Sequence, residues 1–233
     1  MTEARTIKRR GRPAILQRDE IVAAALSYAR DNGLANLSMR ELASHMRTPP
    51  MSLYAHIKNK DDLLVAMLDV VLAKLKPPAI VRGDTKAALK LYLRALRKAL
   101  NTLPGLCNSA VVNGSMTSPM LGIVSTLLKF LSALDQPLKL RVNHCRLLVW
   151  TVLGYCASEI SARTQRDDPA YSSFFSTIET LNAEEHEHLI EALPLLATPQ
   201  PEKVFELMVD FLVEGIWGDS TQSSHLKVSP PKK

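Results

Sequence analysis

Residues 37–64 read LSMRELASHMRTPPMSLYAHIKNKDDLL, and this stretch decides the fold of the first part of the chain. Ser38 is a favourable N-cap, and Glu41 three residues later completes the spacing of a capping box, so a short helix is expected to begin here. The run from Arg47 to Pro50 breaks that helix, and a second short helix is expected from Pro50 to about Ile57. Two short helices joined by a tight break are typical of a helix-turn-helix.

Apolar residues separate an inner from an outer side of this motif. Leu42, Ala43 and Met46 fit the inner side of the first helix, where the small Ala43 lets the second helix cross closely. Leu53 and Ile57 face inward on the second helix, which leaves Pro50, Met51, Ser52, Tyr54, Ala55 and His56 toward solvent or DNA. Hydroxyl groups suit phosphates and base edges, and Met51 and Ala55 suit thymine methyl groups.

The charge of the chain is concentrated around this motif. The 233 residues include 29 Lys and Arg against 23 Asp and Glu, a net charge of +6, and 46% are hydrophobic. Residues 1–60 hold 11 Lys and Arg and 5 Asp and Glu, so the whole excess lies in the first quarter. A basic front followed by a neutral, apolar remainder indicates an anionic partner for the front, and excludes a disordered chain.

Outside the motif, proline and glycine divide the chain into segments of helical period, which predicts an all-α fold. Asp19 is expected to cap a first helix that stops at Asn32-Gly33, and a helix opening at Asp61-Asp62 is expected to reach Leu75. Later helices are expected from Asp84 to Pro104, from about Pro119, from about Pro137 to Arg166, and from about Pro201 to Trp217. The predicted divisions are a basic arm at 1–13, a three-helix DNA-binding domain at 14–76 with its motif at about 38–57, a larger helical domain at 77–217 and a disordered tail at 218–233.

The sequence also resembles a known family. Leu37–Ala43 and Leu53–Leu64, above all the run Leu-Tyr-x-His-x-Lys-x-Lys, resemble the DNA-binding domain of the TetR family of transcriptional repressors over about residues 14–76. The resemblance implies a C-terminal helical domain that dimerises and binds a small-molecule effector. It implies phosphate or base contacts for the matching positions Ser38, Met39, Arg40, Pro50, Met51, Ser52, Tyr54, Ala55, His56 and Lys60. We add Thr48 to this set of expected DNA-binding residues.

Two positions depart from the family pattern. Arg47 stands where the family often has glycine in the turn, and a positive φ at a non-glycine residue costs about 1 kcal/mol unless the turn is remodelled. Pro50 replaces the usual polar residue early in the reading helix, so the base preference of relatives does not transfer. Thr48 is expected to cap that helix, with Pro49 and Pro50 in its first turn.

The arm before the motif offers a further DNA contact. Arg10-Gly11-Arg12-Pro13 looks like the core of an AT-hook, whose arginines enter narrow minor grooves of A·T-rich DNA. A solvated basic tail is the alternative. The position just before a DNA reader favours a minor-groove or phosphate contact for Arg10 and Arg12.

The neutral remainder contains two patterns that fit the implied dimer and pocket. An apolar stripe at helical spacing runs along the last helix, and Gly154, Ser158 and Ser161 are small residues on one side of the long helix, so these two helices are expected to form a four-helix interface. Ordinary packing within one chain is the alternative explanation of either pattern. The stripe comprises Val204, Leu207, Met208, Phe211, Leu212, Gly215 and Ile216. Candidate ligand contacts are Tyr92, Asn113, Met116, His144, Cys145, Trp150, Thr151 and Tyr155, of which His144, Thr151 and Tyr155 share a side of the long helix.

Motifs of catalysis or metal binding are not visible in the sequence. Cys107, Cys145 and Cys156 form no CxxC pair, and the histidines of His186-Glu187-His188 point to different sides of a helix, so no disulfide, metal or cofactor is expected. A hydrophobic signal region is also missing. We therefore predict a cytoplasmic, homodimeric, non-enzymatic regulator that binds a palindromic operator and a small-molecule effector, without membrane contact. An architectural DNA-binding protein and a helical protein-interaction scaffold are the alternatives.

Overall fold

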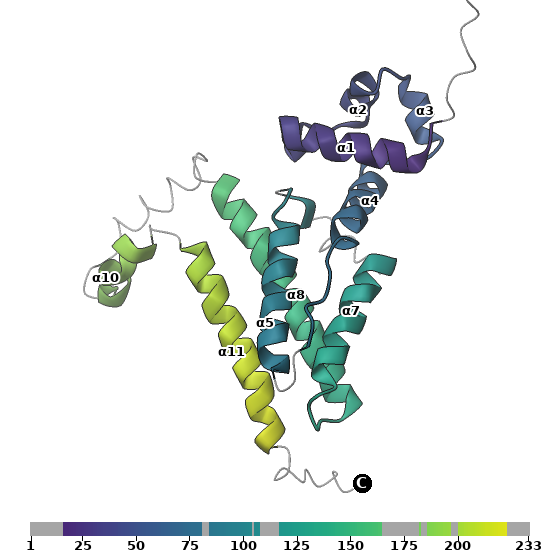
Figure 1. Ribbon diagram of the computed structural model, residues 1–233. Helices are drawn as coiled ribbons and strands as arrows, with labels where there is room; N and C mark the ends of the chain where they lie inside the picture. Colours follow the sequence, from purple (N-terminus) through teal and green to yellow (C-terminus); the bar gives the residue numbers. More distant parts are fainter. Residues whose placement is uncertain are drawn as a thin grey trace, which may run out of the picture. The chain divides into compact units, whose positions relative to one another are not determined.

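The computed structural model describes residues 16–80, 84–103, 105–107, 117–164, 182, 186–196 and 200–222, and within them the regular structure is helical throughout (Figure 1). Two compact units divide the chain, one up to Met67 and one from Leu68 onward. The helices are α1 (Arg18–Asn32), the 3₁₀ turn η1 (Leu34–Asn36), α2 (Met39–His45), α3 (Pro50–Tyr54), α4 (Lys60–Leu72), α5 (Thr85–Leu100), α7 (Ser118–Leu131), α8 (Leu138–Thr164), α10 (Glu187–Leu196) and α11 (Pro201–Gln222).

The first unit is built from α1, α2, α3 and the start of α4. Ile21, Leu42, Leu53 and Leu63 come from these four helices and are all 0% exposed. The predicted stop of α1 at Gly33 is confirmed, with φ of 83°. The predicted cap at Asp19 is wrong: α1 begins earlier, and the Glu20 carboxylate accepts the backbone N–H of Gln17 at 3.0 Å. Asp19 instead lies in the first turn, where a carboxylate still interacts favourably with the helix dipole.

The second unit surrounds α5, which packs against α7, α8 and α11 (Figure 1). The expected Asp84 cap is confirmed, since its side chain accepts the Ala87 N–H at 3.2 Å. Helix α4 ends at Leu72 rather than Leu75, because the next residues tighten into turns such as Leu75 N–H to Leu72 O. Helix α11 continues to Gln222, past the predicted end at Trp217, and residues 223–233 of the predicted tail lie outside the described residues.

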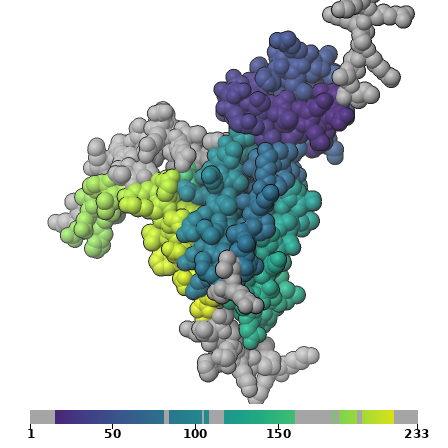
Figure 2. Space-filling model, viewed as in Figure 1, coloured from purple at the N-terminus to yellow at the C-terminus, as the bar shows by residue number. Residues whose placement is uncertain are grey.

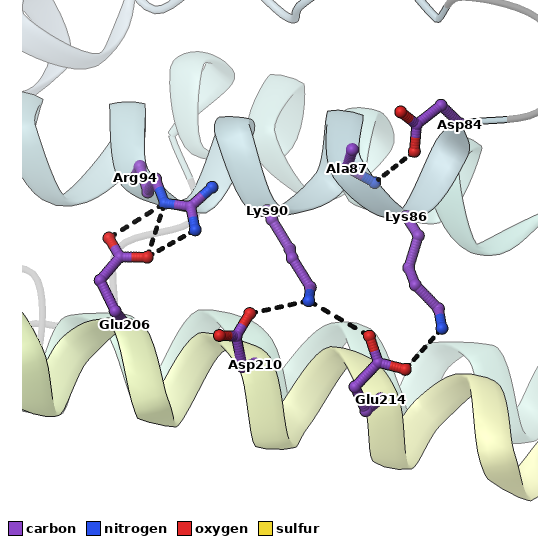
Figure 3. Close-up of polar contacts among 8 residues, drawn as sticks. All are labelled: Asp84, Lys86, Ala87, Lys90, Arg94, Glu206, Asp210 and Glu214. Atoms are coloured by element: carbon purple, nitrogen blue, oxygen red, sulfur yellow. Dashed lines mark hydrogen bonds and ion pairs between the residues drawn. The ribbon is translucent and has the colours of Figure 1, made fainter.

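A row of ion pairs joins α5 to α11, which lie side by side on the face seen in Figure 2. Lys86 contacts Glu214 at 2.5 Å, Lys90 contacts Asp210 at 2.7 Å and Glu214 at 3.2 Å, and Arg94 contacts Glu206 at 2.5 Å (Figure 3). Basic residues on α5 thus face acidic residues on α11 over several turns. This ladder holds α11 in register on α5 by contacts that are largely solvent-exposed, so each pair stabilises only weakly.

Arg97, in the last turn of α5, differs from these cations because its partner carboxylate is buried. Arg97 Nη2 and Nε reach the two carboxylate oxygens of Glu159 on α8 at 2.9 and 3.1 Å, and the Glu159 side chain is 2% exposed. The Asn101 amide donates to the same carboxylate at 3.0 Å. The guanidinium also lies over the Phe205 ring at 4.7 Å, so Arg97 joins α5, α8 and α11.

Candidate nucleic-acid interface

The turn between α2 and α3 has the geometry usually supplied by glycine. The Ser38 hydroxyl accepts the Glu41 N–H at 3.1 Å, which confirms the predicted start of α2. At the other end, Arg47 adopts φ of 53°, with Arg47 N–H bonded to Ser44 O and Thr48 N–H to Ala43 O, both at 3.0 Å. These two bonds are the Schellman pattern. The turn is therefore not remodelled around Arg47, and the residue bears the cost of the left-handed conformation.

The reading helix α3 is shorter than predicted and is capped differently. It covers Pro50–Tyr54, and its N-cap is Pro49 rather than Thr48. Pro49 is extended, with φ −64° and ψ 140°, and its carbonyl accepts the Ser52 N–H at 2.9 Å. Pro50 sits in the first turn, where the missing N–H costs nothing, as predicted. Residues 55 and 56 continue as a turn, in which His56 N–H reaches Leu53 O at 2.9 Å.

The outer side of the motif carries most of the residues that sequence analysis assigned to DNA. Met51 is 77% exposed and Tyr54 46% exposed, while Leu53 between them is 0% exposed and anchors the helix. Ser38, Arg40, Pro50, Ala55 and Lys60 are also exposed, and Thr48, Ser52 and His56 are half-buried. Met39 differs from the rest of this set, because its side chain is 8% exposed and belongs to the core. Arg10 and Arg12 lie outside the described residues.

A clamp that sequence analysis did not find holds this surface in place. Arg18, at the start of α1, donates to the His56 carbonyl at 2.7 Å and to both carboxylate oxygens of Asp62 at 2.7 and 3.1 Å. Asp62 also accepts the Lys58 N–H at 2.9 Å, and Asn59 caps α4 by accepting the Asp62 N–H at 2.8 Å. The Arg18 hydrogen bond holds the pKa of Asp62 below its ordinary value. The clamp fixes the turn between α3 and Lys60.

The residues predicted to contact an effector differ in exposure among those that the structure describes. Tyr92 is 2% exposed and His144 is 9% exposed, Thr151 is half-buried, and the Tyr155 hydroxyl donates to Pro201 O at 2.6 Å. Trp150 is 71% exposed in the single chain and lies outside the core. Asn113 and Met116 lie outside the described residues. A cavity of about 440 Å³ is lined by other residues, from 77–80 and α7.

The residues predicted at the dimer interface are exposed in the single chain. On α11, Val204, Leu207 and Phe211 are 49%, 56% and 76% exposed, and Gly215 is exposed too. On α8, Gly154 and Ser158 are exposed, and Trp150 lies one turn before Gly154 on the same face. The predicted stripe is corrected at Ile216, which is buried at 3% with Phe205, Val209 and Val213, so α11 has two apolar faces. The side chain of Ser161 is not among those described.

Features of catalytic or metal sites are not found among the described residues. The three cysteines are buried, and burial raises the pKa of the Cys156 thiol to about 12, which keeps it protonated and unreactive. In the described part of the chain, no group of three His, Cys, Asp or Glu side chains is placed to hold a metal ion, and this includes the surroundings of His186 and His188. The described helices also include none that is long and apolar enough to cross a membrane.

Comparison with known proteins agrees with this geometry. Residues 21–67 match the family described as bacterial regulatory proteins, tetR family. An HTH-type transcriptional repressor of Mycobacterium tuberculosis is 33% identical over 101 residues, which are 42% of this chain and 39% of that protein. The match thus spans about two fifths of that relative's length.

Two solved structures share the fold over a larger part of the chain. ActR of Streptomyces coelicolor, in complex with actinorhodin, superposes with a TM-score of 0.75 at 24% identity and covers 89% of this chain and 99% of its own. BioQ with its double-stranded DNA operator superposes with a TM-score of 0.57 at 28% identity, over 65% of this chain and 92% of its own. Residues 21–67, which hold most of the helix-turn-helix, thus match the tetR family of bacterial regulatory proteins, and the helical fold that follows them is shared with solved structures of such regulators.

Proposed function

We propose that the protein is a ligand-responsive transcriptional repressor that binds a palindromic operator as a dimer. The observation that carries the proposal is the outer side of α3, where Met51 and Tyr54 are exposed on a helix anchored by the fully buried Leu53. A reading helix of this kind inserts into the major groove. The proposed location is the cytoplasm, where the operator lies, and no enzymatic activity is proposed because the family consists of regulators.

The dimer is supported by large apolar side chains that are exposed on α8 and α11. Single soluble chains seldom expose side chains such as Trp150, Leu207 and Phe211 unless a partner covers them. A second copy would cover these side chains by two-fold symmetry, and would pair two reading helices for the half-sites of a palindrome. Phe211→Glu should therefore shift the protein to a monomer in sedimentation velocity and weaken operator binding. Leu121→Glu, at an exposed site on α7, is the matched control and should leave the dimer intact.

The response to a ligand is proposed from the arrangement of the second unit. The covalent connection between the two units is α4, which begins at Lys60 in the DNA-binding unit and ends at Leu72 in the other. A ligand that displaces the end of α4 would change the spacing of the two reading helices. Two such helices fit successive major grooves only about 34–36 Å apart, so a small displacement is enough to weaken binding. ActR, which shares the fold, has been solved with actinorhodin bound.

Footprinting on the DNA beside the protein's own gene tests the central proposal. A repressor of this kind should protect a short, two-fold symmetric site. An extended, sequence-independent footprint would identify an architectural protein, and no footprint at all would favour a protein-interaction scaffold; either result would overturn the proposal.

Substitutions on the outer side of the motif test the same surface. Tyr54→Ala and Lys60→Ala should weaken operator binding, and loss of the Lys60 phosphate contact should reduce the slope of log K against log salt by about 1. Lys74→Ala removes an exposed lysine beyond the motif and serves as the control. Unchanged binding isotherms for Tyr54→Ala and Lys60→Ala together would show that this face does not meet DNA.

A further inference from the structure

A cavity of about 440 Å³ lies between the segment that follows α4 and one face of α7. Pro77, Pro78, Ala79 and Ile80 form one wall, and Ser125, Thr126, Lys129 and Phe130 form the other. This volume is within the usual range for small-molecule sites, which are mostly apolar with a few polar groups. None of the residues that sequence analysis proposed for the effector lines the cavity.

The α7 wall is rigid because α5 supports it from behind. Phe130 is 1% exposed and packs against the Tyr92 ring with centroids 5.8 Å apart. Burial also raises the pKa of the Tyr92 hydroxyl above its ordinary value. The Thr126 hydroxyl donates to Gly122 O at 2.9 Å. The two prolines on the opposite wall restrict the backbone there. Both walls are therefore preorganised for an apolar body.

The polar groups of the cavity are one cation and two hydroxyls. Lys129 is exposed and makes no ion pair with any residue that the structure describes, whereas Lys86, Lys90, Arg94 and Arg97 in the same unit all contact carboxylates. The lining contains no aspartate or glutamate. An anionic group placed between Lys129 and the Ser125 hydroxyl would receive both charge and a hydrogen bond, whereas the Thr126 hydroxyl already donates to Gly122 O.

We propose that this cavity binds an amphiphilic organic anion. Its ring or hydrocarbon body lies between the Pro77-Pro78 wall and Phe130, and its carboxylate or sulfonate faces Lys129. The cavity has neither the acidic groups that would select a cation nor the length of groove that a peptide needs. The claim that this anion is the effector rests on the proposed function. The claim that the cavity binds such an anion does not depend on it.

The position of the cavity gives the ligand a route to α4. The Thr117 hydroxyl at the start of α7 donates to the Asp69 carboxylate on α4 at 2.5 Å. The other wall, residues 77–80, follows α4 in the chain after a short turn. A ligand that separates the two walls therefore acts on the C-terminal part of α4 through both of its connections.

Binding of naphthalene-1-carboxylate to the full-length protein tests the site, with naphthalene-1-carboxamide as the uncharged probe. Isothermal titration calorimetry should show binding of the carboxylate, and Lys129→Gln should weaken it about three- to fivefold while leaving the carboxamide unchanged. Lys139→Gln, at an exposed lysine on α8, is the control for net charge and should have no effect. Ser125→Trp at an exposed cavity position should fill the space and abolish binding of both probes.

Three results would overturn the inference: no binding of the carboxylate at millimolar concentration, wild-type affinity in Lys129→Gln, or wild-type affinity in Ser125→Trp. Circular dichroism of each variant checks that the helices are intact. The proposed function is tested separately, by footprinting of the wild-type protein without any probe. If the proposed function is wrong, this experiment shows no symmetric footprint. If the footprint is present and the probe binds, release of the operator by the carboxylate, and not by the carboxamide, identifies the cavity as the effector site.

Discussion

Replacing Arg97 by methionine should destabilise the second unit far more than breaking any other ion pair that the structure describes there. Methionine keeps much of the apolar stem of arginine but removes the guanidinium, which contacts Glu159 through two hydrogen bonds of 2.9 and 3.1 Å. The Glu159 carboxylate is then left in a site where its side chain is only 2% exposed. Removing one partner of a buried pair costs about 3–5 kcal/mol, because the other charge has lost both water and its counter-ion.

The loss should be near the lower end of this range. Arg97 is 14% exposed and the Asn101 amide still donates to Glu159, so some compensation remains. Against this, Arg97→Met also loses the cation–π contact with Phe205 at 4.7 Å, which is worth about 0.5–2 kcal/mol. We therefore expect a loss of about 3 kcal/mol in the free energy of unfolding. Glu159→Gln should cost less, about 1–2 kcal/mol, because the remaining cation is partly exposed and lies 3.7 Å from Glu202.

A double-mutant cycle measured by urea unfolding with far-ultraviolet circular dichroism checks the reasoning. The protein concentration is held constant, because the stability of a dimer depends on it. The double variant Arg97→Met/Glu159→Gln should be more stable than Arg97→Met alone, since no buried charge remains. Lys86→Met, which breaks an exposed pair with Glu214, is the control and should change little. A loss below about 1 kcal/mol for Arg97→Met, or a double variant that loses the sum of both single changes, would refute the argument from buried charge.

Three further predictions concern the DNA-binding unit. Arg47→Gly should stabilise it by about 0.5–1 kcal/mol in urea unfolding, because it relieves the left-handed φ of 53°, whereas Arg47→Ala should give no gain. Replacing thymine by uracil in the operator half-site removes only a methyl group from the major groove and should weaken binding several-fold. The Met51→Ala variant should bind both operators equally, because it lacks the side chain assigned to that methyl group. If the variant loses as much affinity as the wild-type protein, Met51 does not contact the thymine methyl group. Arg18→Met should cost about 1 kcal/mol or less at neutral pH, since Arg18 is partly exposed. Because the pKa of Asp62 in the folded state is lowered, this difference should be present above pH 3.8 and disappear as the pH falls further, which unfolding at pH 7 and pH 3 would show.

The helix ends that were predicted correctly depend on partners within a few residues. The Ser38 cap bonds to Glu41, the Asp84 cap bonds to Ala87, and Gly33 stops α1 by its own backbone conformation. The two local errors concern caps that lie slightly off the predicted residue: Gln17 rather than Asp19 caps α1, and Pro49 rather than Thr48 caps α3. The helix starts are instead marked by the bond from Gln17 N–H to the Glu20 carboxylate and by the bond from Ser52 N–H to Pro49 O. The sequence alone did not distinguish these bonds from the ones that the predicted caps would have made.

Among the described residues that the sequence assigned to the DNA side of the motif, Met39 is the one that helical spacing did not place, because the structure buries it. Helical spacing separated Leu53 from Met51 and Tyr54, and the structure confirms that separation. Met39 stands at the first position of α2, where the helix has not completed a turn, so spacing alone does not say which side it faces. Its burial depends on the neighbouring helices of the unit.

By itself, the amino-acid sequence determined that the chain is helical, that a basic helix-turn-helix lies near its start, and which short-range caps begin its helices. Those features follow from interactions within a few residues and from the period of the apolar pattern. The tertiary structure decided which face of α11 is core and which is exposed, since both faces are apolar in sequence. It also decided the pairing of Arg18 with Asp62 and of Arg97 with Glu159, and the cavity beside Lys129. Arg18 and Asp62 are 44 positions apart in the chain, and Arg97 and Glu159 are 62 apart. The two walls of the cavity also come from separate segments, and only the packing of helices brings such groups together.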